Sequence, residues 1–346
     1  MGGRVAIVFG ANGISGVALL TQLIQAPASE WSKIIAISRR PPQLEFDDPR
    51  VVFASVDILK VSVQEFAKIL TDHGAKEAQH AFHYTYIEKP TDQELVDVNT
   101  ELLSKALNAI AAVNPPRFET FVLQTGYKYY GNVHGPPYLA KKPFLEDAPR
   151  SDVASNFYYP QEDLTKSICQ EHEWRWIISR PNTILGVSKG NFMNFAVSLA
   201  IYASLQKSLG RKLGFPGCKE QWNAKNDFST ATNNADFQVW ASLNKQAGNN
   251  AFNTADGPKT QTRDLWHKIA EYFGLEVVAD DEVHNLDIKA FDYATWAFVD
   301  TMMARGWEDD GSHDKMRKFG WNKTVDSIQS FYNIFDKLKE MNIIPK

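Results

Sequence analysis

Residues 5–16 read VAIVFGANGISG, and they predict how the first part of the chain folds. Residues 5–9 are a continuous apolar run typical of a buried β-strand, and apolar residues at helical spacing follow the glycines. Gly10 permits a tight turn, Gly13 lets the backbone approach a pyrophosphate, and Gly16 allows the helix to pack closely on the strand. An ordinary strand-to-helix turn is the alternative, but the order of strand, glycine turn and helix favours a dinucleotide-binding unit.

Further apolar runs of strand length alternate with helical stripes along the first half of the chain. The predicted strands cover residues 34–37, 51–57, 80–86, 121–123 and 174–179. This alternation predicts an α/β fold with a Rossmann-type, doubly wound parallel sheet. Beyond residue 186 the pattern becomes irregular and mostly helical. We therefore expect a dinucleotide-binding domain over residues 1–186 and a smaller, mainly helical substrate-binding lobe over residues 187–346, some segments of which return to the sheet.

The composition argues against several classes of protein. The chain has 37 Lys and Arg against 41 Asp and Glu, a formal charge of -4, and no long run of one sign that would attract a nucleic acid or an anionic membrane. Cys169 and Cys218 are the two cysteines and the histidines are dispersed, so neither a disulfide framework nor a metal centre is expected. No signal peptide or membrane-spanning run is recognisable. We expect a soluble, cytoplasmic protein without nucleic-acid or membrane partners.

The end of the second predicted strand indicates which dinucleotide is bound. Ser38, Arg39 and Arg40 stand where an acidic residue would bind the ribose 2′-hydroxyl of NAD. Two guanidinium groups suit a 2′-phosphate instead, so NADPH is the expected cofactor, and a solvated arginine pair is the alternative. The cofactor candidates at the strand ends are Gly10, Asn12, Gly13, Ile14, Gly16, Ser38, Arg39, Arg40, Tyr84, Thr125 and Gly126.

Two motifs later in the chain indicate the chemistry. Residues 123–130 read LQTGYKYY, in which the apolar strand breaks at Gly126 and delivers Lys128 to the edge where open α/β sheets bind ligands. Residues 156–163 read NFYYPQED and lead into a helix, so a lysine and a pair of tyrosines meet at one crevice. The pattern Thr-Gly-x-Lys-x-Tyr followed by Asn-Phe-Tyr-Tyr-x-x-Glu-Asp resembles the progesterone 5β-reductase/iridoid synthase (PRISE) family of extended short-chain dehydrogenases/reductases.

The resemblance implies that Tyr158 and Lys128 are the catalytic residues. The family has its functional lysine at this strand end, and its functional tyrosine is the first one in Asn-Phe-Tyr-Tyr. Many short-chain dehydrogenases instead place a lysine four residues after the tyrosine, but here Glu162 stands at that position. The family's preference for NADPH agrees with the arginine pair. The resemblance adds cofactor contacts at Asp57, Ile58, Pro181, Asn182 and Ile184.

For this lysine and tyrosine, the resemblance implies reduction of an α,β-unsaturated carbonyl compound. A nearby ammonium group favours the ionised form of a phenol, and Tyr158 would stabilise the enolate oxygen that forms when hydride reaches the β-carbon. Reduction of a ketone by the same groups is one alternative, and a cyclase or isomerase that retains the cofactor site is another. Without such a role, Tyr158 would be a packing residue and Lys128 a solvated surface residue.

An apolar, aromatic pocket is expected for a small-molecule carbonyl substrate. The candidate pocket residues are Tyr130, Tyr159, Phe192, Phe195, Trp296 and Phe298. The sequence departs from the family at Ala297, where the family has an aromatic residue, and at Tyr129, where plant members carry histidine. For any single one of these aromatic residues, a place in the core is the favoured alternative. These patterns do not fix the natural substrate, the product stereochemistry or the oligomeric state, and a homodimer is one option.

Overall fold

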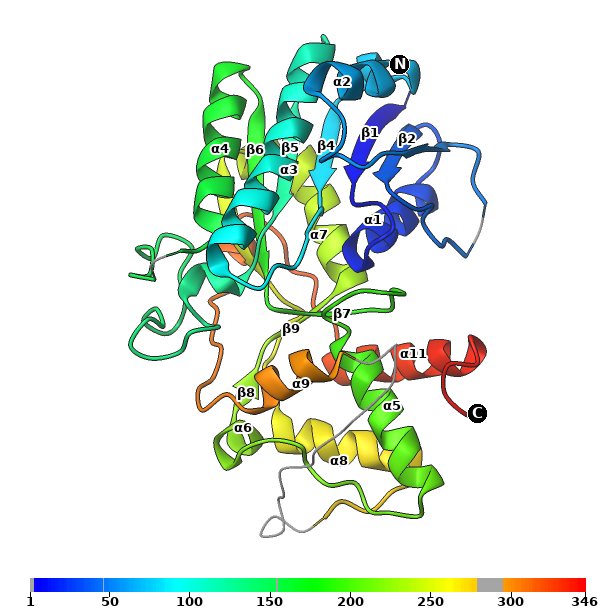
Figure 1. Cartoon of the computed structure of the whole chain (residues 1–346), viewed down its shortest axis with the longest axis vertical. Coiled ribbons are helices and arrows are strands. Elements are labelled where there is room, and N and C mark those ends of the chain that lie inside the picture. The colour runs from blue at the N-terminus through cyan, green and yellow to red at the C-terminus, as the bar shows by residue number, and fades with distance from the viewer. Residues whose placement is uncertain (1–2, 46, 154, 279–294) are drawn as a thin grey trace.

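Seven parallel strands form the main sheet within residues 3–45, 47–153, 155–278 and 295–346, which are the residues that this computed structural model describes (Figure 1). The strands are β1 (Arg4–Phe9), β2 (Trp31–Ser38), β3 (Val51–Ser55), β4 (His80–His83), β5 (Thr120–Gln124), β6 (Arg175–Pro181) and β10 (Asn250–Thr254). They pair in the order β10-β6-β5-β4-β1-β2-β3. The predicted Rossmann-type sheet is confirmed. Its strand order reverses between β1 and β4, which is where such sheets open a ligand crevice.

Helices cover both faces of the sheet (Figure 1). One face carries α2 (Val63–Asp72), η1 (Ala75–Glu77), α3 (Asp92–Val113) and α4 (Tyr158–Glu171). On the other face, α1 (Ile14–Gln25) packs against α7 (Ala231–Leu243). The sheet is therefore doubly wound, with α7 supplied by the second half of the chain.

Local sequence signals start two of these helices. Ser62 caps α2 and Thr91 caps α3. In each case the carboxylate of the glutamate three residues later accepts a hydrogen bond from the backbone amide of the capping residue. These capping boxes satisfy amide groups that a helix start would otherwise leave unpaired. The strand β5 leads instead into a short 3₁₀ helix, η2 (Tyr127–Tyr130), which carries Lys128.

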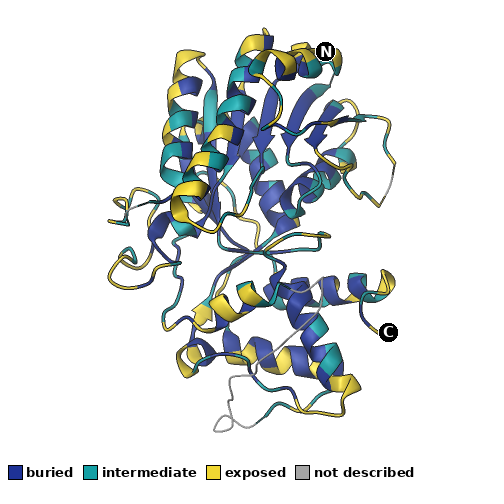
Figure 2. Ribbon diagram, viewed as in Figure 1, coloured by how far each residue is buried: buried dark blue, intermediate teal, exposed yellow. Residues whose placement is uncertain are grey.

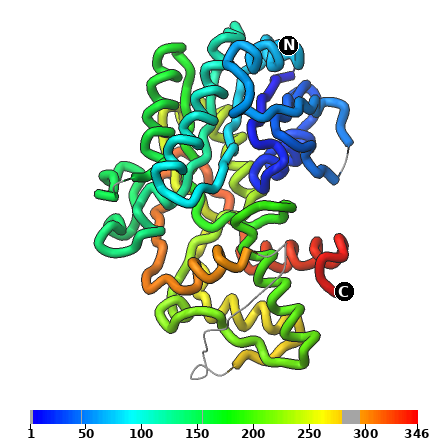
Figure 3. Tube along the Cα trace, viewed as in Figure 1, coloured from blue at the N-terminus to red at the C-terminus, as the bar shows by residue number. Residues whose placement is uncertain are grey.

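The second lobe consists mainly of helices below the sheet (Figure 1). Its elements are β7 (Thr183–Leu185), α5 (Phe195–Ser208), α6 (Lys219–Asn223), β8 (Lys225–Asn226), β9 (Phe228–Thr230), β11 (Thr260–Gln261), α8 (Thr262–Phe273), α9 (Trp296–Met303) and α11 (Ser327–Glu340). The helix α10 (Asp314–Lys318) packs against the sheet instead, at β10. The chain returns from this lobe to the sheet through α7, η3 (Lys245–Ala247) and β10. Figure 3 shows the trace passing between the two parts more than once, so residues 187–346 are not a separate unit.

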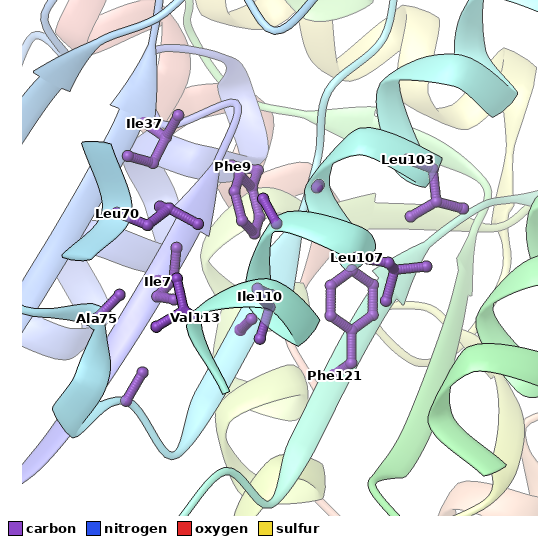
Figure 4. Close-up of a cluster of buried hydrophobic side chains, with 14 of the residues drawn as sticks. Ile7, Phe9, Ile37, Leu70, Ala75, Leu103, Leu107, Ile110, Val113 and Phe121 are labelled. Atoms are coloured by element: carbon purple, nitrogen blue, oxygen red, sulfur yellow. The ribbon is translucent and has the colours of Figure 1, made fainter. Parts of the chain in front are cut away.

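The buried residues follow this architecture (Figure 2). One core lies between the sheet and the face formed by α2, α3 and α4, where side chains such as Phe9, Leu107 and Phe121 are fully buried (Figure 4). Burying one such side chain contributes about 1.5–3 kcal/mol. A second core lies under α1 and α7, and a third fills the second lobe. The carboxyl ends of the strands remain between these cores, and the candidate site lies there.

Candidate active site

A cavity of about 480 Å³ lies at the carboxyl ends of the strands. Its wall includes the turn between β1 and α1, the ends of β2 to β6, the start of α4 and parts of the second lobe. It therefore extends from the glycine-rich turn to the segment that carries Lys128 and Tyr158. Both halves of the chain contribute to this one site.

The glycine-rich turn has the geometry that a dinucleotide needs. Gly10 has a φ of +79°, and a Cβ at this position would lie 2.8 Å from the carbonyl carbon of Tyr84. A Cβ on Gly16 would lie 2.2 Å from the carbonyl oxygen of Gly10, so this glycine lets α1 pack against the turn. Gly13 begins α1 without a side-chain cap. The amide groups of this helix start can therefore bind a pyrophosphate.

The groups predicted to bind the adenosine end lie together on the cavity wall. Ser38, Arg39 and Arg40 line it, and Asp57 and Ile58 from the end of β3 lie on the same wall. The Ser38 hydroxyl donates a 2.7 Å hydrogen bond to the carbonyl oxygen of Arg40, which fixes this turn. Both arginine side chains are exposed and can reach a phosphate.

A polar network that the sequence analysis missed supports the middle of the site. The Gln124 amide donates to the hydroxyl of Ser15 at 3.0 Å, and its oxygen accepts from Asn234 at 2.7 Å and from Gln238 at 3.1 Å. The Tyr84 hydroxyl donates to Gln238 in turn. Gln124, Ser15 and Tyr84 line the cavity. The network thus fixes the start of α1, the end of β5 and α7 relative to one another. The position of Gln124 at the end of a strand was the one feature of the sequence that could have indicated it.

Lys128 and Tyr158 reach the cavity from two elements that Asn156 joins. The Asn156 amide donates a 2.7 Å hydrogen bond to the carbonyl oxygen of Lys128, and its oxygen accepts from the Tyr158 amide at 3.1 Å. A Cβ on Gly126 would lie 3.2 Å from the Tyr158 hydroxyl and 2.9 Å from the carbonyl oxygen of Pro181. Glycine at position 126 therefore lets the phenol lie directly against the end of β5.

The phenol of Tyr158 keeps its proton at neutral pH. Burial raises its pKa above the ordinary value, and the carboxylates of Glu162 and Glu88 raise it further. The opposite effect expected from a nearby ammonium group stays a prediction. A protonated phenol can donate a hydrogen bond or a proton to a carbonyl oxygen.

The ammonium group of Lys128 lies beside two neighbouring aromatic rings. Its Nζ is 5.6 Å from the ring centre of Tyr86 and 5.5 Å from that of Phe157. Burial lowers the pKa of Lys128, whereas the carboxylate of Glu88 raises it. The Tyr86 hydroxyl donates to Glu88. Cation–π contacts of this kind hold the ammonium group at the cavity wall.

An ion pair beneath the site fixes the start of α4. Arg180 Nε donates to Glu162 Oε1 at 2.9 Å, and Nη2 donates to Oε2 at 2.7 Å. The two side chains are 2% and 0% exposed. The guanidinium carbon also lies 3.4 Å from the ring centre of Tyr129. Because Glu162 follows Tyr158 by one helical turn, the pair ties the start of α4 to β6.

Comparison with known proteins identifies the family. A family model described as a PRISE-like Rossmann-fold domain matches residues 6–294. The chain belongs to this family. Among curated PRISE relatives, the 3-oxo-Delta(4,5)-steroid 5-beta-reductase of Arabidopsis thaliana is 31% identical, with 99% of this chain and 93% of the relative covered. The (S)-8-oxocitronellyl enol synthase of Nepeta cataria is 30% identical over the same shares of the two chains. The short chain dehydrogenase gsfE of Penicillium aethiopicum is 30% identical, with 99% of this chain and 100% of the relative covered.

Solved structures show the wider fold of this PRISE-family chain. An epimerase from Methanothermobacter thermautotrophicus superposes with a TM-score of 0.73 at 17% identity, covering 98% of this chain and 93% of its own. The UDP-glucuronic acid 4-epimerase of Bacillus cereus, solved with NAD, has a TM-score of 0.69 at 15% identity, covering 98% and 99%. Taken with the curated relatives, these results make this PRISE-family chain an oxidoreductase of the short-chain dehydrogenase/reductase type.

The predicted cofactor residues of this PRISE-family chain lie together, with one exception. Gly16 is the exception, because it packs behind the turn. The others all line the cavity: Gly10, Asn12, Gly13, Ile14, Ser38, Arg39, Arg40, Asp57, Ile58, Tyr84, Thr125, Gly126, Pro181, Asn182 and Ile184. Lys128 and Tyr158 line it as well.

The predicted substrate pocket is corrected at four of its six positions. Phe192 and Phe298 line the cavity, whereas Tyr130, Tyr159, Phe195 and Trp296 do not. Tyr130 is fully buried and donates to Asn253 at 2.6 Å. Tyr159 points away, since its hydroxyl donates to the carbonyl oxygen of Tyr129 at 2.8 Å. Phe195 and Trp296 pack in the core of the second lobe.

The wall also contains residues that the sequence analysis did not single out. They include Tyr86, Glu88, Gln124, Asn132, Val133, Phe157, Gln161, Met193, Met302 and Arg305. The positions of Met302 and Arg305, four and seven residues after Phe298, were the available signal, because these spacings share one helical face. Among the residues described, no group of three or more His, Cys, Asp or Glu side chains could hold a metal ion. None of the described helices is long and apolar enough to cross a membrane.

Proposed function

We propose that this chain is an NADPH-dependent reductase of a small α,β-unsaturated carbonyl compound, an enone or an enal. The observation that carries the proposal is that one cavity is lined by a dinucleotide-type glycine turn and by both Tyr158 and Lys128. The names of the steroid reductase and enol synthase relatives support the same substrate class. Both cysteines are free, which is compatible with the reducing cytoplasm, the compartment we propose.

Groups suited to NADPH lie along the wall of the cavity. The amide groups at the start of α1 would bind the pyrophosphate, and the guanidinium groups of Arg39 and Arg40 would bind the 2′-phosphate. Lys128 would hold the nicotinamide ribose, as the motif implies. When bound, NADPH would supply the hydride. The exclusion of water from this end of the cavity falls to Phe157, Phe192 and Phe298.

Tyr158 then carries the proton chemistry. Its hydroxyl would donate a hydrogen bond to the substrate's carbonyl oxygen and stabilise the enolate that forms as the β-carbon is reduced. Lys128 would favour the same transition state by its positive charge. Protonation of the enolate at its α-carbon completes the saturated carbonyl product. Because Gly126 leaves room beside the phenol, the substrate oxygen can approach it without displacing β5.

The test is NADPH oxidation over a panel that pairs simple enones and enals with their saturated counterparts, with the products identified by mass and NMR. Turnover of the unsaturated compounds alone would support the proposal. Turnover of the saturated ketones would instead establish carbonyl reduction. Tight NADPH binding without any turnover would favour a cyclase or isomerase.

The Tyr158→Phe variant tests whether the phenol stabilises the enolate oxygen. We expect kcat to fall by about 10²–10³ while the affinity for NADPH stays within about twofold, because one donor to the developing oxyanion is lost. Tyr159→Phe is the matched control, since the Tyr159 hydroxyl bonds to the protein backbone outside the cavity. Near-normal turnover in Tyr158→Phe would remove the assignment.

A further inference from the structure

A polar group stands on the otherwise apolar face that α9 turns to the cavity. Phe298 and Met302 line the cavity from this helix, and Arg305 lines it one turn further along. Ala304 still has helical backbone angles, φ −82° and ψ −3°, so Arg305 continues the same face. This places a guanidinium group beside the substrate region.

Two loops form the wall around Arg305. The loop after η2 contributes Asn132, and the loop after α9 contributes Arg305, which Asp309 of the same loop supports from behind the wall. The Trp307 indole donates to the carbonyl oxygen of Asn132 at 2.9 Å and holds the loops together. The Asn132 amide donates to Asp309 Oδ2 at 2.8 Å, and Arg305 Nη1 donates to the same oxygen at 3.0 Å.

The hydrogen-bonding capacity of this wall is only partly used in the described part of the chain. Arg305, Asn132 and Asp309 are 7%, 3% and 2% exposed, yet Arg305 Nε and Asn132 Oδ1 have no partner. An unsatisfied buried polar group costs about 1–3 kcal/mol, so native proteins rarely leave one without a reason. Asp309 Oδ1 also has no partner among the described residues. Arg305 and Asn132 both line the cavity, so an unused donor and an unused acceptor belong to side chains of its wall, and they match a ligand group that both accepts and donates.

The charges decide which ligand group fits. Asp309 already balances the positive charge of Arg305, so a carboxylate would meet a carboxylate already in place. A hydroxyl accepts from Arg305, donates to Asn132 and adds no charge. Arg305 and Lys128 both line the cavity, and the positive charge of Arg305 is one of the causes that lower the pKa of Lys128.

We propose that Arg305 and Asn132 bind a hydroxyl of the substrate that is remote from the carbonyl group being reduced. The inference rests on the proposed reductase function and narrows its substrate class to hydroxylated enones or enals. The apolar side chains of Val133, Phe192, Met193, Phe298 and Met302 would bind the carbon chain between the two polar ends. Arg305 is thus a specificity residue, whereas Tyr158 performs the chemistry.

The test compares two linear enals of equal length, one ending in a hydroxyl and the other in a methyl group. We expect Arg305→Met to raise KM for the hydroxylated enal about tenfold, because one charge-assisted hydrogen bond is lost, and to leave kcat unchanged. KM for the methyl-terminated enal should stay within about twofold. Arg317→Met is the control, since Arg317 is half-exposed and does not line the cavity. Equal changes for both enals would overturn the inference.

Loss of folding is separated from loss of binding by a second variant. Arg305→Met leaves Asp309 buried without its counter-ion, whereas Arg305→Met combined with Asp309→Leu removes both charges, which is often tolerated. The double variant should show the same selective rise in KM. An unchanged preference for the hydroxylated enal in a folded double variant would contradict the proposal.

Equilibrium binding keeps this inference distinct from the proposed function. The saturated alcohols that correspond to the two enals can be titrated calorimetrically into the protein loaded with NADP+. If neither enal is reduced, the reductase proposal fails. The hydroxyl site still stands if the hydroxylated ligand binds more tightly than the other and Arg305→Met removes that difference. If the two ligands bind equally to the wild-type protein, the hydroxyl site fails.

Discussion

Replacing Glu162 by glutamine should destabilise the protein far more than replacing its neighbour Asp163 by asparagine. Each carboxylate pairs with an arginine, Glu162 with Arg180 and Asp163 with Arg150. The first pair is 2% and 0% exposed, whereas the second is 40% and 57% exposed. The two substitutions are chemically alike, so the difference between them isolates the effect of burial.

The magnitude follows from what Glu162 provides. It accepts two hydrogen bonds from Arg180, at 2.9 and 2.7 Å, and Glu162→Gln leaves that guanidinium buried without a counter-ion. Losing one partner of a buried pair costs about 3–5 kcal/mol, and losing an exposed pair costs about 0–1 kcal/mol. For a chain of 346 residues the larger loss corresponds to a fall in Tm of about 4–7 °C.

Urea denaturation of both variants, followed by far-UV circular dichroism and tryptophan fluorescence, measures the difference directly. The expected result is a lower midpoint for Glu162→Gln and an almost unchanged midpoint for Asp163→Asn. Equal losses would refute the reasoning, because they would mean that burial of the ion pair contributes nothing. A double variant, Glu162→Leu with Arg180→Met, should recover much of the loss, since no charge then remains buried.

Three further results are expected. Gly10→Ala should abolish NADPH binding, because the added Cβ would lie 2.8 Å from the carbonyl carbon of Tyr84. The control Gly210→Ala, at a φ of +63° in open space, should lower the free energy of unfolding by only about 1–2 kcal/mol in a urea melt. NADPH binding by Gly10→Ala would contradict this reasoning. Arg40→Ala should raise KM for NADPH about tenfold and leave KM for NADH unchanged, and an equal change in both would exclude contact with the 2′-phosphate. Burial lowers the pKa of His83 to about 3, whereas in the unfolded chain it is about 6.5. As the pH falls from about 6.5 towards 3, His83 is therefore protonated in the unfolded chain but not in the folded one, and stability is lost. His83→Gln should reduce that slope by about 1.4 kcal/mol per pH unit in urea melts, and an unchanged slope would contradict it.

The sheet was predictable because its signals are local. Residues 5–9 carry an apolar run of strand length, and the glycine turn follows directly, so a short window contains the whole pattern. The return of β10 to the edge of the sheet is different in kind. Its five residues, Asn250–Thr254, include two asparagines, and their pairing with β6 depends on contacts across some seventy positions of the chain. Periodicity cannot report such a partner.

The direction of each side chain limited the prediction of the pocket. Tyr130 follows Lys128 by two positions in a 3₁₀ helix, where neighbouring side chains point to different sides. Lys128 therefore reaches the cavity while Tyr130 turns into the core and bonds to Asn253. Tyr158 and Tyr159 separate in the same way at the start of α4. Adjacent aromatic residues in a motif thus identify the site without showing which ring faces it.

The charge on the cavity wall explains why one site can accept both an anionic cofactor and a neutral substrate. The chain has a formal charge of -4, yet Arg39 and Arg40 line one end of the cavity, so the field there is opposite to that of the molecule as a whole. At the other end Asp309 offsets Arg305, and Tyr158 is neutral because burial holds its proton. The arginine pair therefore suits the phosphate-bearing end of the cofactor, whereas the paired charges of Arg305 and Asp309 and the neutral phenol of Tyr158 leave an uncharged carbonyl compound to bind by shape and hydrogen bonds.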